Sequence, residues 1–506
     1  MPSAFFKNYR VYLLTAVAYM GSLLFGYDTG VMGSVLALAS FREDFGLPPD
    51  SKGFGGSKNA QVSSNVVSLL TAGCFFGSIA AAFCNDRFGR KLSLMGFSLV
   101  FLIGAAVQTS ASHSIGQIYA GRVIAGLGVG GCLHYSCFSS QKMLLPALED
   151  ESRECFKSSW YSVLPLLTGL NYGVALHIPK STKQWRIPVA IQLIPGGFLL
   201  IGLFFLKESP RWLAKQGRYE EATASMAWTR CTTIEDEEIM QEIAEIRASI
   251  EEEMAATEGL TWKECLAPAN RFRFFSAFCL MFWQQFSGTN SIGYYAPQIF
   301  QTIGISAANT ALFATGIYGT SLIFGAAWMM AMMFILSAVL VTHPPDTKST
   351  TVAPASIAMV VMIYLFVIGY SASWGPIPWV YVSEIFPTRL RSYGVGLAAT
   401  TQWLCNFSIT EITPIAVSNI GWRTFLMFGF FCFGMCVWSF FIIKETKGKT
   451  LEELDILFGA VNAERRAQDV EAVLHSKKDI VHHEGDESVG SKAGTIRVED
   501  SPEKTS

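Results

Sequence analysis

The chain contains 506 residues, of which 51% are hydrophobic and only 15% are charged. A soluble domain usually carries about 25% charged residues, so this composition excludes an ordinary soluble protein and indicates one that lies in a lipid bilayer. The formal net charge of −2 offers no basic surface for nucleic acid. The 11 cysteines lie mostly within apolar runs, without the paired spacing of a disulfide framework or a zinc site.

Long apolar runs recur along the whole chain. A bilayer core of about 30 Å requires roughly 20 apolar residues in a helix. Because the first run is too long for the apolar region of a signal peptide, we expect it to remain as the first span. The predicted spans cover residues 11–38, 62–83, 93–110, 116–133, 187–206, 275–301, 353–380, 393–416 and 423–443, with a weaker one at 156–176 and one long run at 307–342.

Two polar segments divide this pattern. Residues 207–271 form a hydrophilic loop with helical patches such as Glu237 to Met254, and residues 444–506 form a polar tail that should be mostly disordered. The loop separates residues 1–206 from residues 272–443, so we expect two membrane bundles. Lys and Arg gather at alternate span ends, which predicts that both termini and the loop are cytoplasmic.

An acidic residue, Asp28, lies in the middle of the first predicted span, within GYDTGVMG. A carboxylate at membrane depth is costly and requires a partner or a proton. Burial favours the protonated form of a carboxylate and a nearby cation favours the ionised form, so a paired acid there can load and release a proton. Arg122, in AGRVIAGLGVGG of the fourth span, is the expected partner. The simpler alternative is that each group lies near a helix end and reaches water.

A charged loop, NDRFGRK at residues 85–91, follows the second span. It contains Asp86, Arg87, Gly89 and Arg90. This order of residues is much rarer than the general excess of Lys and Arg that cytoplasmic loops carry. We expect Asp86 to cap the N-terminus of a neighbouring helix, where negative charge is favoured, and so to form a latch that breaks in another conformation. An ordinary cytoplasmic basic loop is the simpler alternative.

Polar side chains interrupt an apolar run in FWQQFSGTNSIGYYAPQIF at residues 282–300. Gln284, Gln285, Asn290 and Tyr294 offer donors and acceptors that suit a polyhydroxylated ligand. Hydrogen bonding between helices without a ligand is the alternative. Because adjacent glutamines cannot share one helix face, we expect at least one of them to be structural.

A helix-breaking motif, SWGPIPWVYVSEIFPTRLRSYG, occupies residues 373–394. Gly375 and the prolines around it permit a bend that exposes backbone to a cavity. Trp379 offers an apolar surface for stacking on a sugar ring, although tryptophans also mark membrane interfaces. Glu384 and Arg389 form a charged cluster at the predicted cytoplasmic end.

Together these motifs resemble the sugar porter family of the major facilitator superfamily. The resemblance covers most of residues 10–455. The sequences of the motifs look most like those of fungal hexose, pentose or quinate transporters. It implies an all-α membrane protein with twelve helices in two six-helix bundles, of which about eleven are evident, and transport by alternating access. The motifs that carry it are GYDTG, NDRFGRK, GRVIAGLGVG, KESPRWL (207–213), QQFSGTNSIGYYAP, SWGPIPWVYVSEIFPTRLRSYG and KETKGKTLEEL (444–454).

The resemblance also implies roles for individual residues. Asp28 and Arg122 match the acid and arginine of proton-coupled members, so we expect symport. The expected substrate contacts are Phe25, Gln284, Gln285, Asn290, Tyr294, Gly375, Trp379 and Asn406. Asn406 also lies in a glycosylation sequon, NFS, but inside a predicted span where the modification is excluded. The expected conformational latches use Asp86, Arg87, Gly89, Arg90, Glu208, Arg211, Glu384, Arg389 and Glu445.

Two regions depart from the family pattern. Residues 132–172 are polar where the end of span four, a loop and span five are expected, which indicates a local reading-frame shift. The run 307–342 has 36 residues and would reach about 54 Å as one helix, yet it is too short for two helices and a loop. We therefore expect one span to be shortened or lost near residues 320–326.

The leading hypothesis is a proton-coupled symporter of a monosaccharide, a hexose or a pentose, in a fungal plasma membrane. The expected partners of such a symporter are the lipid bilayer, a small solute and the proton as coupling ion. We expect a monomer without a cofactor or metal. We find no nucleophile, metal or cofactor constellation in the sequence, so an enzyme is not expected. The alternatives are a quinate or polyol permease that takes a hydroxylated acid or alcohol, a sugar sensor that does not transport, and a defective transporter.

Overall fold

The fold comes from a computed structural model, in which residues 9–47, 56–139, 173–174, 177–257, 259, 262–302, 321–344 and 353–444 are described. The weaker predicted span at 156–176 lies almost wholly outside these residues, as do Glu445 and nearly all of the predicted tail. Most of the anomalous segment 132–172 and the first part of the run 307–342 also lie outside them.

The regular elements of the described residues are all helices, which confirms the predicted all-α class. The first half contains α2 (Tyr9–Ala37), α3 (Ala39–Asp44), α4 (Gly56–Phe88), α5 (Arg90–Thr109), α6 (Ile115–Ser139), α8 (Thr182–Ile191) and α9 (Leu193–Phe205). The connecting segment contains α10 (Pro210–Lys215), α11 (Tyr219–Arg230), α12 (Glu237–Thr257) and the short η2 (Trp262–Leu266). The second half contains α13 (Pro268–Phe286), α14 (Thr289–Thr302), α15 (Ser321–Thr342), α16 (Pro354–Ala372), α17 (Ile377–Ile385), α18 (Thr388–Ile420) and α19 (Arg423–Ile442).

Several helices have the length and apolar surface of membrane spans. Phe83 and Phe441 are 73% and 74% exposed, which is typical of side chains that face lipid rather than water. Within the described residues, six segments are long and apolar enough to cross a bilayer: Lys58–Phe88, Arg90–Thr109, Thr182–Phe205, Leu322–Thr342, Pro354–Ile385 and Arg423–Ile442.

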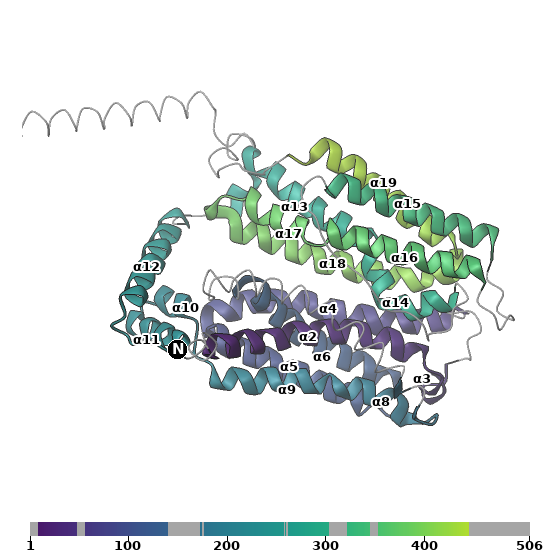
Figure 1. The fold of residues 1–506 in the computed structure, drawn as a ribbon, viewed down its shortest axis with the longest axis horizontal. Helices are drawn as coiled ribbons and strands as arrows, with labels where there is room; N and C mark the ends of the chain where they lie inside the picture. Colours follow the sequence, from purple (N-terminus) through teal and green to yellow (C-terminus); the bar gives the residue numbers. More distant parts are fainter. Residues whose placement is uncertain are drawn as a thin grey trace, which may run out of the picture.

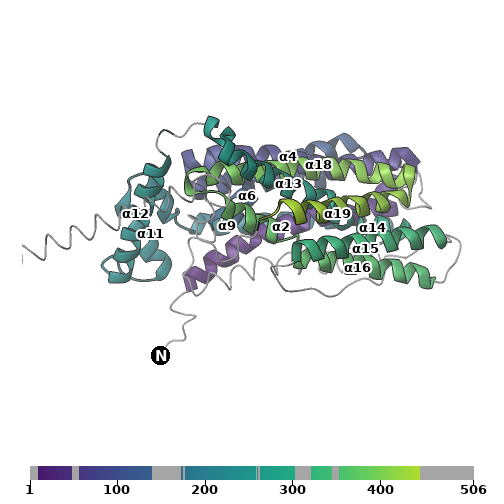
Figure 2. The same cartoon turned by 90° about the horizontal axis from the view of Figure 1, so that it is seen from above.

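The helices form two groups that lie side by side (Figure 1). The first-half helices, drawn in purple and blue, lie below the second-half helices, drawn in green, and α10, α11 and α12 cover one end. The main contacts between the groups are α4 with α18 and α2 with α14. Figure 2 shows α4 and α18 running along each other over much of their length.

Two of the predicted spans are each divided into two helices. Gly288 has φ of +88°, a left-handed conformation that glycine adopts readily, and it separates α13 from α14 within the predicted span 275–301. In the predicted span 353–380, α16 ends at Ala372 and α17 begins at Ile377. Each break frees backbone groups that polar side chains can reach.

Glycines bring α4 and α6 into backbone contact. A Cβ at Gly73 would lie 2.5 Å from the Val123 carbonyl oxygen, and one at Gly130 would lie 2.2 Å from that of Cys74. Small residues at such spacing allow membrane helices to approach closely without an apolar driving force from water. The glycine-rich motif of α6 therefore determines how near Arg122 lies to α4.

Candidate functional site

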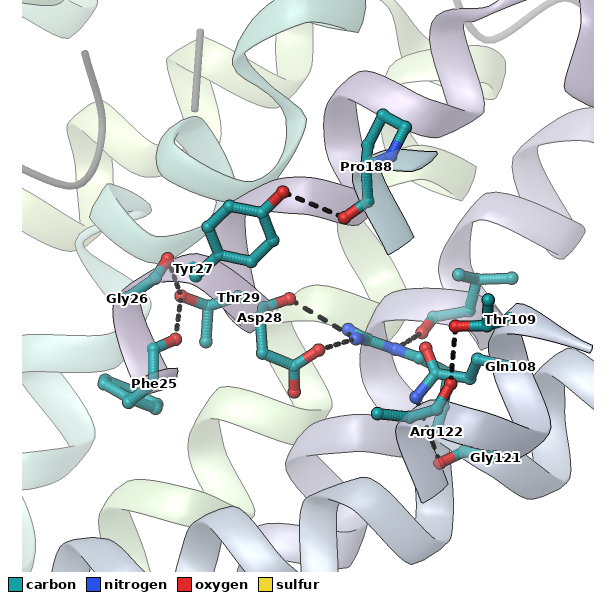
Figure 3. A network of polar contacts seen from close by, with 12 residues as sticks. Phe25, Gly26, Tyr27, Asp28, Thr29, Gln108, Thr109, Gly121, Arg122 and Pro188 are labelled. Atoms are coloured by element: carbon teal, nitrogen blue, oxygen red, sulfur yellow. Dashed lines mark hydrogen bonds and ion pairs between the residues drawn. The ribbon is translucent and has the colours of Figure 1, made fainter. Parts of the chain in front are cut away.

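A buried ion pair joins α2 to α6. Arg122 donates from Nη1 to Asp28 Oδ1 at 2.6 Å, and both side chains are 0% exposed (Figure 3). The structure therefore brings together the two residues that the sequence predicts to be partners, inside the helix group rather than at a water-exposed end.

The pair is only partly satisfied by hydrogen bonds. Arg122 donates from Nε to the Val66 carbonyl of α4 at 2.8 Å and from Nη1 to the Asp28 carbonyl at 3.3 Å. Asp28 Oδ2 and Arg122 Nη2 are buried without a hydrogen-bond partner. A buried pair with unmet groups is costly to keep ionised, so a proton or a polar ligand can be accommodated here.

Hydrogen bonds from neighbouring residues hold the helices around the pair. Tyr27 donates from its hydroxyl to the Pro188 carbonyl of α8 at 2.8 Å, and Gln108 of α5 donates from Nε2 to the Gly121 carbonyl at 3.2 Å (Figure 3). These bonds link α2 to α8 and α5 to α6. The helices around Asp28 and Arg122 are thus fixed in place.

A second polar group lies in the second half, at the helix breaks. Gln284 donates from Nε2 to the carbonyls of Trp374 and Gly375, at 2.8 and 3.1 Å. Its amide therefore satisfies the backbone that the break between α16 and α17 leaves open. This geometry fits the expectation that one of the adjacent glutamines is structural.

The other polar residues of this group bond to one another. Gln285 donates to Gln284 Oε1 at 3.3 Å and accepts a hydrogen bond from Asn290 of α14. Asn406 of α18 donates from Nδ2 to the Tyr294 hydroxyl at 3.1 Å, while its Oδ1 is buried without a partner. The structure thus collects α13, α14 and α18 side chains that can exchange hydrogen bonds with a hydroxylated solute.

Aromatic candidates lie in different surroundings. Phe25 of α2 meets Trp403 of α18 edge to face, with ring centroids 6.0 Å apart, so it contributes to the contact between the halves. Trp379 of α17 is half-buried. Their contact with substrate stays a prediction.

The latch residues at the α4–α5 turn meet an acid from another segment. Glu208 Oε1 accepts the backbone N–H groups of Arg90 and Lys91, each at 3.0 Å, at the N-terminus of α5. Gly89 has φ of +92°, and a Cβ there would lie 2.6 Å from Glu208 Oε2. The glycine therefore allows the carboxylate to approach.

The structure shows no helix cap by the Asp86 carboxylate among the described residues. At the start of α5 the capping acid is Glu208, whose carboxylate accepts the first N–H groups of that helix. The Asp86 carbonyl accepts the indole N–H of Trp212 at 3.2 Å, and its carboxylate lies 3.9 Å from Lys215 Nζ. Arg87 is exposed beside the Phe88 ring. Arg211, on α10, is half-buried.

The second predicted charged cluster includes an acid from another segment. Arg389 binds Glu264 of η2 with two hydrogen bonds of 2.9 Å, and these bonds raise the pKa of Arg389. Glu384 is exposed at the end of α17. Sequence reasoning missed Glu264 because nothing in the local sequence indicates that η2 packs against the start of α18.

Sequence reasoning also missed a second acid within the membrane helices. Glu411 lies in α18, inside the predicted span 393–416, and accepts a hydrogen bond from the Ser68 hydroxyl of α4. The rule that singled out Asp28 applies to Glu411 as well, since an ionisable residue in a membrane span indicates function.

Comparisons with known proteins agree with this fold. The family model for "Sugar (and other) transporter" matches residues 14–458. A probable quinate permease of Neosartorya fischeri is 35% identical over 520 residues, which cover 97% of this chain and 95% of that protein. A quinate permease of Neurospora africana is 34% identical over 481 residues and is matched over 89% of both chains. The inward-open structure of the xylose transporter XylE from E. coli has a TM-score of 0.70 at 24% identity, over 88% of this chain and 99% of that one.

The helical halves and the likeness to XylE show the major facilitator fold, and the matching family model and relatives are those of membrane transporters rather than enzymes. The family model spans most of the chain, and relatives above 30% identity cover nearly all of it. The chain belongs to the sugar transporter family of the major facilitator superfamily.

Proposed function

We propose that this protein is a proton-coupled symporter that moves a monosaccharide, a hexose or a pentose, by alternating access. The observation that carries the proposal is the fully buried Asp28–Arg122 pair, with one carboxylate oxygen and one guanidinium nitrogen unpaired. An ionisable pair at this depth is costly, and transport of a proton is a use that compensates for the cost.

The proposed cycle needs one proton on Asp28. When the carboxylate takes a proton from one side of the membrane, the charge that holds Arg122 is neutralised and their attraction weakens. Arg122 can then exchange its contacts, including the one with the Val66 carbonyl. After the halves rock, loss of the proton to the other side restores the ion pair.

The proposed solute site uses the polar group of α13, α14 and α18. Amides and phenols offer both donors and acceptors, which suits the hydroxyls of a sugar. Asn406 supports this assignment because its buried Oδ1 has no protein partner. Tyr294 accepts the hydrogen bond of Asn406, and Gln285 and Asn290 bond to each other, whereas Gln284 serves the backbone of the α16–α17 break.

A quinate permease is the second candidate, and it is supported by relatives at 34–35% identity that are named quinate permeases. A carboxylate substrate requires a cation that can bind it. Arg122 offers a buried Nη2 without a protein partner, which is the feature that a carboxylate would need.

Reconstituted protein separates these candidates. Vesicles containing the protein are tested for uptake of labelled glucose, labelled xylose and labelled quinate, with a pH-sensitive dye inside. The proposal expects sugar uptake with acidification of the lumen, and no competition by quinate. Quinate uptake without sugar uptake favours the second candidate, and sugar uptake without proton movement contradicts the coupling.

A further inference from the structure

Glu411 connects the two halves of the transporter. The Ser68 hydroxyl of α4 donates to Glu411 Oε2, and the Ser64 hydroxyl donates to the Glu411 carbonyl at 2.6 Å. Ser64 and Ser68 are four residues apart, so they lie on one face of α4. An acid from the second half is therefore held at two points by one turn of a first-half helix.

The acid lies deep along its helix. Glu411 is 23 positions after Thr388, the first residue of α18, which corresponds to about 35 Å along the axis. Nine further positions remain before Ile420. Glu411 is therefore about six turns from the start of α18 and about two and a half turns from its end, inside the predicted span 393–416, where an ionisable side chain is costly and indicates a functional role.

The same turn of α4 is also bound to the coupling pair. The Val66 carbonyl, between the two serines, accepts the Nε hydrogen bond of Arg122 at 2.8 Å. Tyr119, one turn before Arg122 on α6, shares a hydrogen bond with the neighbouring Asn65. The α4 turn 64–68 is thus bound both by the arginine of the pair and by Glu411.

The Glu411 region of α18 is bound in turn to α14. Tyr295 donates to the Thr410 carbonyl at 2.9 Å, and the hydroxyls of Ser291 and Thr413 lie 2.8 Å apart. These bonds flank Glu411 on α18 and continue the polar group that includes Asn406. A movement of α14 is therefore transmitted to the residues next to Glu411.

We propose that Glu411 is a hydrogen-bonded clasp between the halves, formed with Ser64 and Ser68, and that it links the state of the Asp28–Arg122 pair to the α14 polar group. The inference rests on the proposed transport function and adds a residue that positions the halves relative to each other. In this structure the clasp is closed. Rocking of the halves breaks it, and release of Arg122 from Val66 loosens the α4 turn that holds it.

The test follows the accessibility of residue 64 in purified protein. Ser64→Cys keeps a weak donor to the Glu411 carbonyl and places a reactive thiol at a position that is 0% exposed, and the Ser68 bond is left intact in this parent variant. Its reaction with N-ethylmaleimide is followed by mass spectrometry of the peptide that carries it, so native cysteines do not interfere. Glu411→Ala and Ser68→Ala each remove the bond between the Ser68 hydroxyl and the Glu411 carboxylate and should raise the labelling rate about tenfold, as expected for the loss of a hydrogen bond to a charged group.

Two control variants separate the clasp from general loosening. Ser78→Ala removes another α4 hydroxyl, which bonds only the Phe75 carbonyl of its own helix, and should leave the labelling rate unchanged. Glu411→Gln keeps an acceptor oxygen for Ser68 and should stay within about threefold of the parent. Equal rates in Ser68→Ala and Ser78→Ala would overturn the proposal.

A further variant tests the link between the clasp and the coupling pair. Asp28→Asn removes the charge that holds Arg122 and should raise labelling at residue 64 by about the same factor as Glu411→Ala. An unchanged rate in Asp28→Asn, beside a raised rate in Glu411→Ala, overturns the link and leaves a merely structural contact. Labelling needs neither solute nor proton gradient. Failure of sugar uptake with the expected labelling pattern therefore counts against the transport proposal alone.

Discussion

Gly126 of α6 lies so close to Leu70 of α4 that a Cβ on the glycine would come within 2.2 Å of the leucine carbonyl oxygen. Gly126 is one turn after Arg122 on the same helix, so this contact sets the distance from the guanidinium to α4. The Nε hydrogen bond of Arg122 to Val66 depends on that distance. The coupling pair is therefore positioned by backbone contact rather than by side-chain packing.

Gly126→Ala should destabilise the folded protein. A single methyl group against backbone atoms cannot be accommodated by a rotamer change, so α4 and α6 must separate, at a cost of about 2 kcal/mol. The matched control is Gly96→Ala on α5, because a Cβ there meets nothing within 4 Å. Thermal unfolding in detergent should show a lower midpoint for Gly126→Ala and an unchanged or higher one for Gly96→Ala. Equal midpoints would show that the helices have room to adjust.

The sequence predicts the pairing of Asp28 with Arg122 because an ionisable residue in an apolar run has few ways to be satisfied. The same rule applies to Glu411 in the span 393–416, where only Asn406 was predicted to be functional. The partners of Glu411, Ser64 and Ser68, are more than 340 positions away in the sequence. Small hydroxyl residues on α4 carry no local signal of a partner in the other half.

Contacts made across the fold are the part that local patterns do not specify. Glu208 rather than Asp86 caps α5, because the choice depends on how the segment after α9 returns to the α4–α5 turn. Gln284 bonds the backbone of the α16–α17 break, which requires knowing both where the helix breaks and which helix faces it. In both cases the residue types indicated polar contacts, but the partners of those contacts are determined by the tertiary structure.

Asp28→Asn should abolish proton-driven accumulation while leaving exchange of solute intact. With one proton per solute, a gradient of about one pH unit supports roughly tenfold accumulation, since one pH unit corresponds to about 1.4 kcal/mol. The amide cannot load a proton, so accumulation in reconstituted vesicles should stay near equality. Asp44→Asn is the control, because Asp44 accepts a hydrogen bond from the Trp185 indole and an amide oxygen can do the same. Full accumulation in Asp28→Asn, with an unchanged pH profile, contradicts the proposed coupling.

Asn406→Ala should weaken solute binding. The substitution removes the buried Oδ1 that has no protein partner and the Nδ2 donor to Tyr294, so a bound hydroxyl loses about 1 to 1.5 kcal/mol, close to a tenfold rise in KM. Ser408→Ala is the control on the same helix, because the Ser408 hydroxyl bonds the Leu404 carbonyl of α18 itself. Uptake measured over a range of concentrations should show a raised KM for the first variant only. Equal KM values would place the solute away from α18.

Gly89→Ala and Glu208→Gln should impair transport through the same interaction. The alanine is strained at φ of +92° and its Cβ collides with Glu208 Oε2, while the glutamine removes the charge that accepts the α5 N–H groups. Each variant should lose about 1 to 3 kcal/mol of latch stability, visible as a changed rate of net uptake. Because both act on one contact, the double variant should lose less than the sum of the two single losses. Glu221→Gln is the control, since its ion pair with Arg218 is exposed and such pairs contribute little. Additive losses in the double variant would mean that Gly89 and Glu208 act separately.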